Sequence, residues 1–296
     1  MMKTTLQAEP LLAHLCELGE GPLWDDALQC IHWLDIEYGR IYSFTRDDKL
    51  VIVEIHQRIG CIALCTGKNE WLAGLENGLA TIRRDNGAIT FISDPESHLP
   101  GNRFNDGKCD PAGRFWAGTM SMKEESGAGN LYMLETDRMV TKKIAGVTIS
   151  NGMAWSKDKK TFYYIDTPTN AVTAWDFNNT NGTISGKKTI ISIPEAEGSP
   201  DGMTIDTEGM LWIAHWGGGQ VSRWNPATGK KVLSVTLPVK RVTSCTFGGK
   251  NLGDLYITTA RKGMDAQEQE SQPLAGGLFV VRNCGYSGFP ASAYRG

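Results

Sequence analysis

The chain has 296 residues and a formal net charge of −3, and 41% of its residues are hydrophobic. This composition supports a sizeable core, and it lacks the basic excess with which proteins bind nucleic acid or an anionic membrane surface. No stretch approaches the roughly 20 apolar residues that span a bilayer, and the first residues do not resemble a signal peptide.

Six short strands centred on an aromatic residue recur along the chain. Their central residues are Trp33, Trp71, Trp116, Tyr164, Trp212 and Tyr256, spaced by 38, 45, 48, 48 and 44 residues. A period in this range is typical of a repeat architecture. Each unit also contains a strand before and a strand after the aromatic one, and a fourth strand is visible at 50–55 and 187–192. The sequence therefore predicts an all-β fold, a six-bladed β-propeller with four-stranded blades, as a single domain over residues 1–296.

The last repeat has no obvious fourth strand. We expect the N-terminal segment around residues 7–15 to supply it, because closing the ring leaves no long sheet edge free. The irregular stretch 261–276 lies between the second and third strands of this blade and predicts a long surface loop. The seven cysteines are scattered without a Cys-x-x-Cys pair, which predicts reduced thiols and a cytoplasmic protein.

The residues just before the innermost strands fall at one register of the repeat. They are Glu20, Ile59, Asp106, Asn151, Asp201 and Ser244. Because innermost strands line the central channel of a propeller, residues at one register should converge near one of its mouths. Glu20, Asn151 and Asp201 would then gather three oxygen donors, with Arg103 and Asn105 on the same side. Converging carboxylates favour a cation between them, and these donors suit Ca²⁺, Mg²⁺ or Mn²⁺.

A simpler interpretation of these positions is that Asp-Gly and Asn-Gly pairs form ordinary turns. The loops that join second to third strands should overhang the same mouth, including 120–129 and 261–276. In one of these loops, His215 and Trp216 could either line a pocket or cap the end of a strand. Polar and aromatic walls around a metal would form a site for a small molecule.

Five segments of the chain carry a family resemblance. They are 18–24, 103–108, 115–120, 150–155 and 200–203. They resemble, in the same order, segments of the SMP-30/gluconolactonase/luciferin-regenerating (regucalcin-like) family of six-bladed propellers. The resemblance implies one divalent metal ion (Ca, Zn, Mn, Mg or Fe) on Glu20, Asn151 and Asp201, and substrate contacts from Arg103 and Asn105.

A glutamate after the Gly-Thr-Met segment also contacts substrate in some members of that family. Glu124 is our candidate for this role, and Glu125 is the alternative, because the segment here is one residue longer than in the animal members. Members of the family commonly hydrolyse sugar lactones. The resemblance therefore implies a small-molecule sugar lactone as the partner, with neither nucleic acid nor membrane, and leaves the oligomeric state open.

The predicted function is that of a lactonase, which opens an aldonolactone to the aldonic acid. The metal would polarise the lactone carbonyl, Asp201 would act as the general base, and Arg103 and Asn105 would orient the sugar. The alternatives are a non-catalytic, calcium-handling propeller or scaffold, and a side activity on another ester or phosphotriester. No Gly-x-Ser-x-Gly elbow or nucleotide-binding fingerprint is present, which disfavours serine-hydrolase and nucleotide chemistry.

Overall fold

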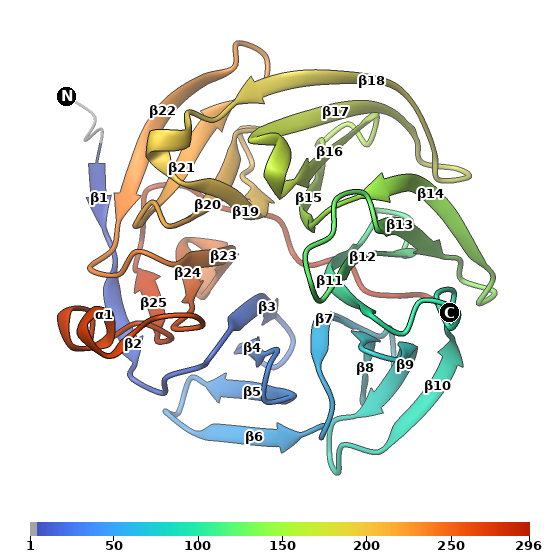
Figure 1. Cartoon of the computed structure of the whole chain (residues 1–296), viewed down its shortest axis with the longest axis horizontal. Coiled ribbons are helices and arrows are strands. Elements are labelled where there is room, and N and C mark those ends of the chain that lie inside the picture. The colour runs from blue at the N-terminus through green and yellow to red at the C-terminus, as the bar shows by residue number, and fades with distance from the viewer. Residues whose placement is uncertain (1–4) are drawn as a thin grey trace.

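The computed structural model describes residues 5–296 and confirms a six-bladed β-propeller around a central channel (Figure 1). Within each blade, consecutive strands pair antiparallel from the channel outward. The strands of blades 1 to 3 are β3 (Gly19–Asp25), β4 (Cys30–Asp35), β5 (Arg40–Thr45) and β6 (Leu50–Glu54); β7 (Ile59–Leu64), β8 (Glu70–Leu75), β9 (Gly78–Arg83) and β10 (Ile89–Ser93); and β11 (Asn102–Cys109), β12 (Phe115–Ser121), β13 (Gly129–Leu134) and β14 (Val140–Val147).

Blades 4 to 6 repeat this order, and N-terminal strands complete the last two. They contain β15 (Ser150–Trp155), β16 (Thr161–Asp166), β17 (Ala171–Asn178) and β18 (Thr183–Ser192); β19 (Ser199–Ile205), β20 (Leu211–Trp216), β21 (Gln220–Asn225) and β22 (Lys230–Thr236); and β23 (Val242–Gly248), β24 (Asp254–Thr259) and β25 (Leu278–Val281). The predicted ring closure is confirmed, because β2 (Glu9–Leu12) pairs with β25 as the outer strand of blade 6. One pairing was not anticipated: β1 (Thr5–Gln7) lies parallel to β22 and gives blade 5 a fifth strand.

The aromatic residues that mark the repeat form the packing between blades. All six are buried, and the exposed fraction of the largest, Trp33, Trp71, Trp116 and Trp212, is at most 2%. The Trp116 and Trp212 indoles donate to Asp110 Oδ2 at 3.0 Å and to Asp206 Oδ2 at 2.9 Å. Apolar clusters bridge neighbouring blades, so these side chains stabilise the ring.

Each innermost strand contains a β-bulge near its start, where the pairing with the second strand shifts register. Glu20, Asn151 and Asp201 therefore lie inside the strands, and the expectation that they precede the strands is wrong. Close packing requires the glycine after Asn151 and Asp201, since a Cβ on Gly202 would lie 2.0 Å from Ser244 Oγ in the next blade, whereas Gly21 adopts a positive φ of 54°. These pairs are bulges in the channel wall, which bend the strand and re-aim side chains, and the turn interpretation does not apply to them.

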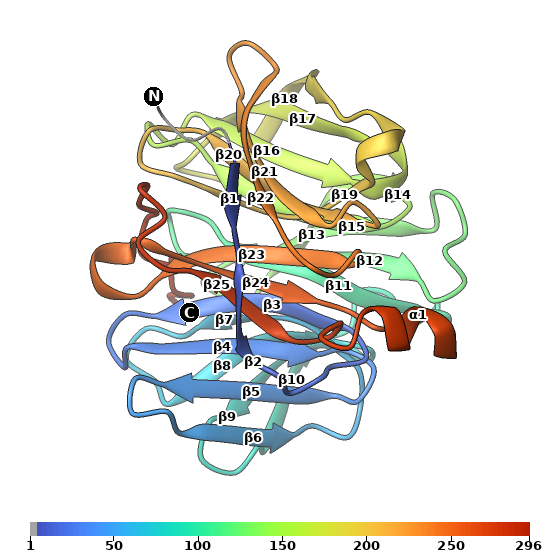
Figure 2. The same cartoon turned by 90° about the vertical axis from the view of Figure 1, so that its left-hand side faces the viewer.

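Short helices occur only in the connections of the described chain. They are the 3₁₀ turns η1 (Thr167–Thr169), η2 (Glu195–Glu197) and η3 (Lys250–Leu252), and the helix α1 (Ala266–Ser271). α1 lies within the long loop predicted at 261–276, and Asp265 caps its N-terminus in a capping box with Glu268. Over residues 5–296, no helix is long and apolar enough to cross a membrane. In Figure 2, α1 and the C-terminal segment after β25 lie on opposite faces of the ring.

The channel therefore has two distinct mouths. The upper mouth is the end on the α1 face, where the innermost strands begin at Glu20, Asn151 and Asp201. The lower mouth is the opposite end, where the same strands finish at residues such as Trp24 and Trp155 and the C-terminal segment crosses the ring.

Candidate functional site

The structure brings Glu20, Asn151 and Asp201 together at the upper mouth. Each lies at the bulge of its innermost strand, on β3, β15 and β19, and their exposed fractions are 8%, 4% and 6%. Burial, followed by the nearby charge of Asp106, raises the pKa of the Glu20 carboxyl. Burial, followed by the charges of Glu20 and Asp106, raises the pKa of Asp201, and the neighbouring Gly202 and Asn151 partly oppose this rise. Two carboxyl groups and one amide thus share a small, poorly hydrated volume.

A hydrogen-bond chain holds the Asn151 amide in place. Its Nδ2 donates to Thr167 Oγ1 at 2.9 Å, and the Thr167 hydroxyl donates to the carbonyl of Pro200 at 2.9 Å. Asn151 Oδ1 has one long contact, 3.5 Å to Asn105 Nδ2, and so remains available to a cation. Thr167 therefore positions a proposed ligand from the loop between β16 and β17.

Arg103 and Asn105 lie beside this group on β11, as expected, and both are buried. Arg103 Nη1 donates to Asn105 Oδ1 at 2.7 Å and to the carbonyl of Phe104 at 2.9 Å. Asn105 Nδ2 donates to the carbonyl of Ser150 at 2.8 Å, which ties this pair to the strand that carries Asn151. Burial lowers the pKa of Arg103, and this residue also lines a small cavity of about 110 Å³ between blades 2 and 3. The guanidinium is thus fixed and keeps further N–H donors for a ligand.

Glu124 and Glu125 lie apart from the buried group. Both are exposed on the loop after β12, and within residues 5–296 no hydrogen bond joins either carboxylate to Arg103, Asn105 or the acidic pair. Glu124 has a positive φ of 56°, a conformation that a non-glycine residue adopts uncommonly. A substrate contact from Glu124 remains a prediction.

Ion pairs across three blades border the upper mouth. Glu37, between β4 and β5, accepts from Arg58 Nε at 2.8 Å and from Lys262 Nζ at 2.6 Å. Arg58 also contacts Glu76 at 3.2 Å. These contacts connect the loops of blades 6, 1 and 2, so they order the rim beside the buried carboxyl groups.

Two residues of this region have roles that the sequence did not assign. Asp106 lies on β11, burial raises the pKa of its carboxyl, and its charge acts on both Glu20 and Asp201. In the sequence repeat, Asp106 lies at the same position as Glu20, Asn151 and Asp201, so the sequence pattern could have identified it. His215 is fully buried, with Nδ1 3.1 Å from Glu197 O and Nε2 against Ser222 Oγ. It therefore packs in the wall between β20 and β21 and does not line an open pocket.

The residues at the upper mouth fit a hard divalent cation. Within the described part of the chain, no three His, Cys, Asp or Glu side chains are grouped to hold a metal. The candidate set has two carboxyl groups, with the Asn151 amide as the third donor, and such oxygen donors suit hard ions. A cation would also offset the burial and the mutual repulsion that raise the two carboxyl pKa values. With only three protein donors, the site would keep positions open for water or a substrate.

Comparisons with known proteins give one consistent family. Residues 18–261 match the model of the SMP-30/Gluconolactonase/LRE-like region. Regucalcin from Sus scrofa is 37% identical over 299 residues, which cover 99% of this chain and 100% of that protein. The crystal structure of a calcium-binding protein, regucalcin from Agrobacterium tumefaciens, has a TM-score of 0.93 at 29% identity and covers 99% of this chain and 100% of that one. A luciferin-regenerating enzyme structure has a TM-score of 0.91 at 30% identity, covering 97% and 99%.

Proposed function

The chain belongs to the SMP-30/gluconolactonase/LRE-like family, and we propose that it is a metal-dependent hydrolase that opens a sugar lactone to the aldonic acid. One observation carries this proposal. A buried pair of carboxyl groups, Glu20 and Asp201, lies beside a guanidinium and an amide that are already fixed by hydrogen bonds. A protein that only bound a cation would not need Arg103 next to the site.

A divalent cation held by Glu20, Asn151 and Asp201 would supply Lewis acidity toward the lactone carbonyl. In the proposed reaction, Asp201 accepts a proton from the attacking water, whose oxygen bonds to the carbonyl carbon. The acyl carbon–oxygen bond of the ring then breaks, and the proton passes to the ring oxygen, which leaves as a hydroxyl. The products are a free hydroxyl and a carboxylic acid, which ionises to the carboxylate by releasing its remaining proton to solvent. A general base in this position contributes about 10²–10⁴ in rate.

Arg103 and Asn105 would orient the substrate in this scheme. The amide of Asn105 is held between Arg103 Nη1 and the carbonyl of Ser150, so its direction is set before a ligand arrives. Such preorganisation reduces the entropy lost on reaching the reactive geometry. The remaining N–H donors of Arg103 suit sugar hydroxyl or carbonyl oxygens. Glu124 would have to approach from the exposed loop after β12.

A second candidate is calcium binding without turnover. The oxygen-only donor set favours it, as does the similarity to an Agrobacterium protein described as calcium-binding. Metal analysis of protein purified without chelator, paired with a lactone panel, separates the two candidates. We expect a pentono- or hexonolactone to open faster than the metal-only blank, and chelator to remove the excess rate. If the protein holds metal but opens no lactone faster than the blank, calcium binding without turnover is the candidate that remains.

We also propose that the protein is cytoplasmic. All seven cysteines are buried as free thiols, and reduced thiols are typical of cytosolic proteins. Fractionation of expressing cells checks this: the protein should be in the cytosolic fraction, and recovery from a secreted or periplasmic fraction would contradict it.

A further inference from the structure

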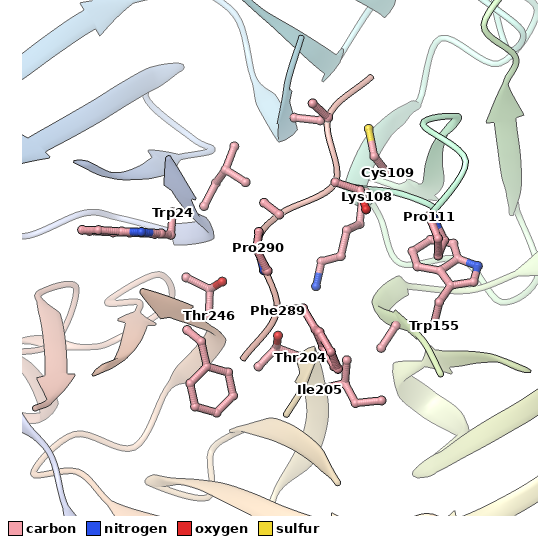
Figure 3. A pocket seen from close by; sticks show the side chains of 18 of the residues that line it. Trp24, Lys108, Cys109, Pro111, Trp155, Thr204, Ile205, Thr246, Phe289 and Pro290 are labelled. Atoms are coloured by element: carbon pink, nitrogen blue, oxygen red, sulfur yellow. The ribbon is translucent and has the colours of Figure 1, made fainter. Parts of the chain in front are cut away.

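A cavity larger than the one beside Arg103 lies at the lower mouth, and its lining extends along the channel as far as Gly21 and Asp106, next to Glu20. Its volume is about 590 Å³, within the range of small-molecule pockets. All six innermost strands contribute to its lining, and Figure 3 shows side chains from different blades converging on one space. The apolar part of the wall includes Trp24, Ile62, Trp155, Ile205, Phe247 and Phe289.

Lys108 extends from β11 into the middle of this cavity (Figure 3). Its Nζ donates to the carbonyl of Met203 at 2.9 Å, and no ion pair to it occurs among residues 5–296. An ammonium group has three donors, so two N–H groups remain for an acceptor inside the cavity. Burial lowers the pKa of Lys108, and the charge of Asp106 opposes this change. Lys108 is half-buried, and an anionic partner would offset the cost of removing part of its ammonium from water.

The charges around this cavity favour an anion. Lys157, Lys159 and Arg295 also line it, and all three are exposed at its rim. The one acidic residue in the lining is Asp106, whose Oδ1 is already engaged by the backbone N–H of Gly107 at 2.7 Å. An incoming anion would therefore meet the basic rim first and the half-buried Lys108 ammonium next.

The C-terminal segment forms one wall of the cavity and is tied down at both ends. At one end, the N–H of Gly288 donates to Leu252 O at 3.0 Å. At the other, the N–H of Tyr294 donates to Leu64 O at 2.7 Å, and its buried hydroxyl donates to Glu135 O at 2.7 Å. Between them, residues 289–293 line the cavity and form no backbone hydrogen bond within the described chain. Residues 289–293, which we call the strap, can therefore adjust to a ligand without breaking the strand pairing of any blade.

We propose that the lower mouth is a binding site for a small amphipathic carboxylate, in which Lys108 binds the carboxylate and the indole and aliphatic walls enclose an apolar ring or chain. A single ammonium with no arginine beside it inside the cavity suits a monoanion better than a phosphate, which recruits several donors. The apolar wall likewise disfavours a polyhydroxylated sugar, so this ligand differs in class from the lactone proposed for the upper mouth.

A matched ligand pair tests the proposal. Isothermal titration of the full chain with 2-naphthoate and with neutral 2-naphthamide isolates the contribution of the negative charge. Both titrations are run with chelator present, so that a metal at the upper mouth cannot hold the carboxylate. We expect one naphthoate per chain, bound at least about tenfold more tightly than the amide, which corresponds to about 1.4 kcal/mol.

Three variants locate the site. Lys108→Met should remove the preference for naphthoate over the amide, whereas Lys157→Met, at the exposed rim, should keep most of it. Thr246→Phe, which fills the cavity, should weaken both ligands. Equal affinity for acid and amide, an unchanged preference in Lys108→Met, or no binding of naphthoate at millimolar concentration would overturn the proposal. If Lys108→Met fails to fold, unchanged affinity for both ligands in Thr246→Phe would overturn it as well.

Discussion

The two mouths of the channel are built from the same six strands, yet they differ in chemistry. On β15, for example, Asn151 lies at the upper end and Trp155 at the lower end, and β3 runs likewise from Glu20 to Trp24. Four residues of strand span roughly 13 Å, so the two environments are close but separate. The upper mouth concentrates buried carboxyl groups, and the lower mouth holds the half-buried Lys108 ammonium within an apolar wall. On our two proposals, the same ring of short strands would hold one site for a cation and one for an anion.

The largest effect should come from the upper mouth. Asp201→Asn keeps the size of the side chain but removes the proposed base and a proposed cation ligand. We expect kcat on the preferred lactone to fall by at least about 100-fold, the lower range for loss of a general base. Steady-state kinetics with saturating metal measures this.

Asp47→Asn is the matched control, because Asp47 is exposed on the turn between β5 and β6, and its kcat should stay at the wild-type value. In chelator, Asp201→Asn should melt no lower than the wild type, since it removes a buried carboxyl that burial and Glu20 disfavour in its charged form. A kcat near wild type in Asp201→Asn would end its assignment as base.

The next prediction concerns how much a bound metal ion stabilises the folded protein, which should depend on the upper mouth and not on the lower one. A cation that binds only the folded protein stabilises it by about 2.7 kcal/mol when its concentration is 100 times its Kd. Glu20→Gln should lose most of this gain, while Lys108→Met, at the other mouth, should retain it. Thermal unfolding of each variant with metal and with chelator checks the difference. Equal loss in both variants would show that the two mouths are not independent.

The sequence predicted the ring and most of the upper mouth because both follow the repeat. Trp116 and Trp212 occupy the same position of their second strands, and Trp33 lies one residue beyond that position, which His32 occupies in blade 1. The spacing of large buried aromatic residues was still regular enough to indicate the repeat. The same periodicity places Glu20, Asn151 and Asp201 at one register. What it did not show is that this register is a bulge, because pairing shifts depend on the second strand as well as the first.

Features outside the repeat could not be predicted in this way. β1 has only three residues and pairs with a strand more than 200 positions away, so no local pattern marks it. Lys108 sits two residues after Asp106 on the same strand, but nothing periodic indicates that the lower mouth is hollow. That cavity depends on the strap at 289–293, which has no counterpart in the other blades.

A smaller effect concerns the wall of the upper mouth. Burial lowers the pKa of His215 to about 4, from an ordinary value of 6.5. Between these pH values the imidazole binds a proton in the unfolded chain but not in the folded chain. The contribution of neutral His215 to the free energy of unfolding is therefore fully present above pH 6.5 and is lost as the pH falls toward 4. The loss should be on the order of 3 kcal/mol.

Urea unfolding at several pH values, in chelator, measures the loss for the wild type and for His215→Gln. The variant should be less stable at pH 7 and should lose less stability on acidification. A residual slope is expected from His32, whose pKa burial also lowers. Parallel curves for the two proteins would contradict the assignment of His215 as a buried neutral imidazole.

The smallest effect should come from Arg103. Its guanidinium donates to Asn105 Oδ1 and Phe104 O, so Arg103→Ala would leave the Asn105 amide without one of its fixed partners. If Arg103 binds substrate equally in the ground and transition states, KM should rise about tenfold, close to 1.4 kcal/mol, with little change in kcat. Arg58→Ala, which removes a rim ion pair at the same mouth, should change KM far less because exposed pairs contribute little. Unchanged KM and kcat in Arg103→Ala would exclude it from the substrate site, and a fall in kcat alone would give it a role confined to the transition state.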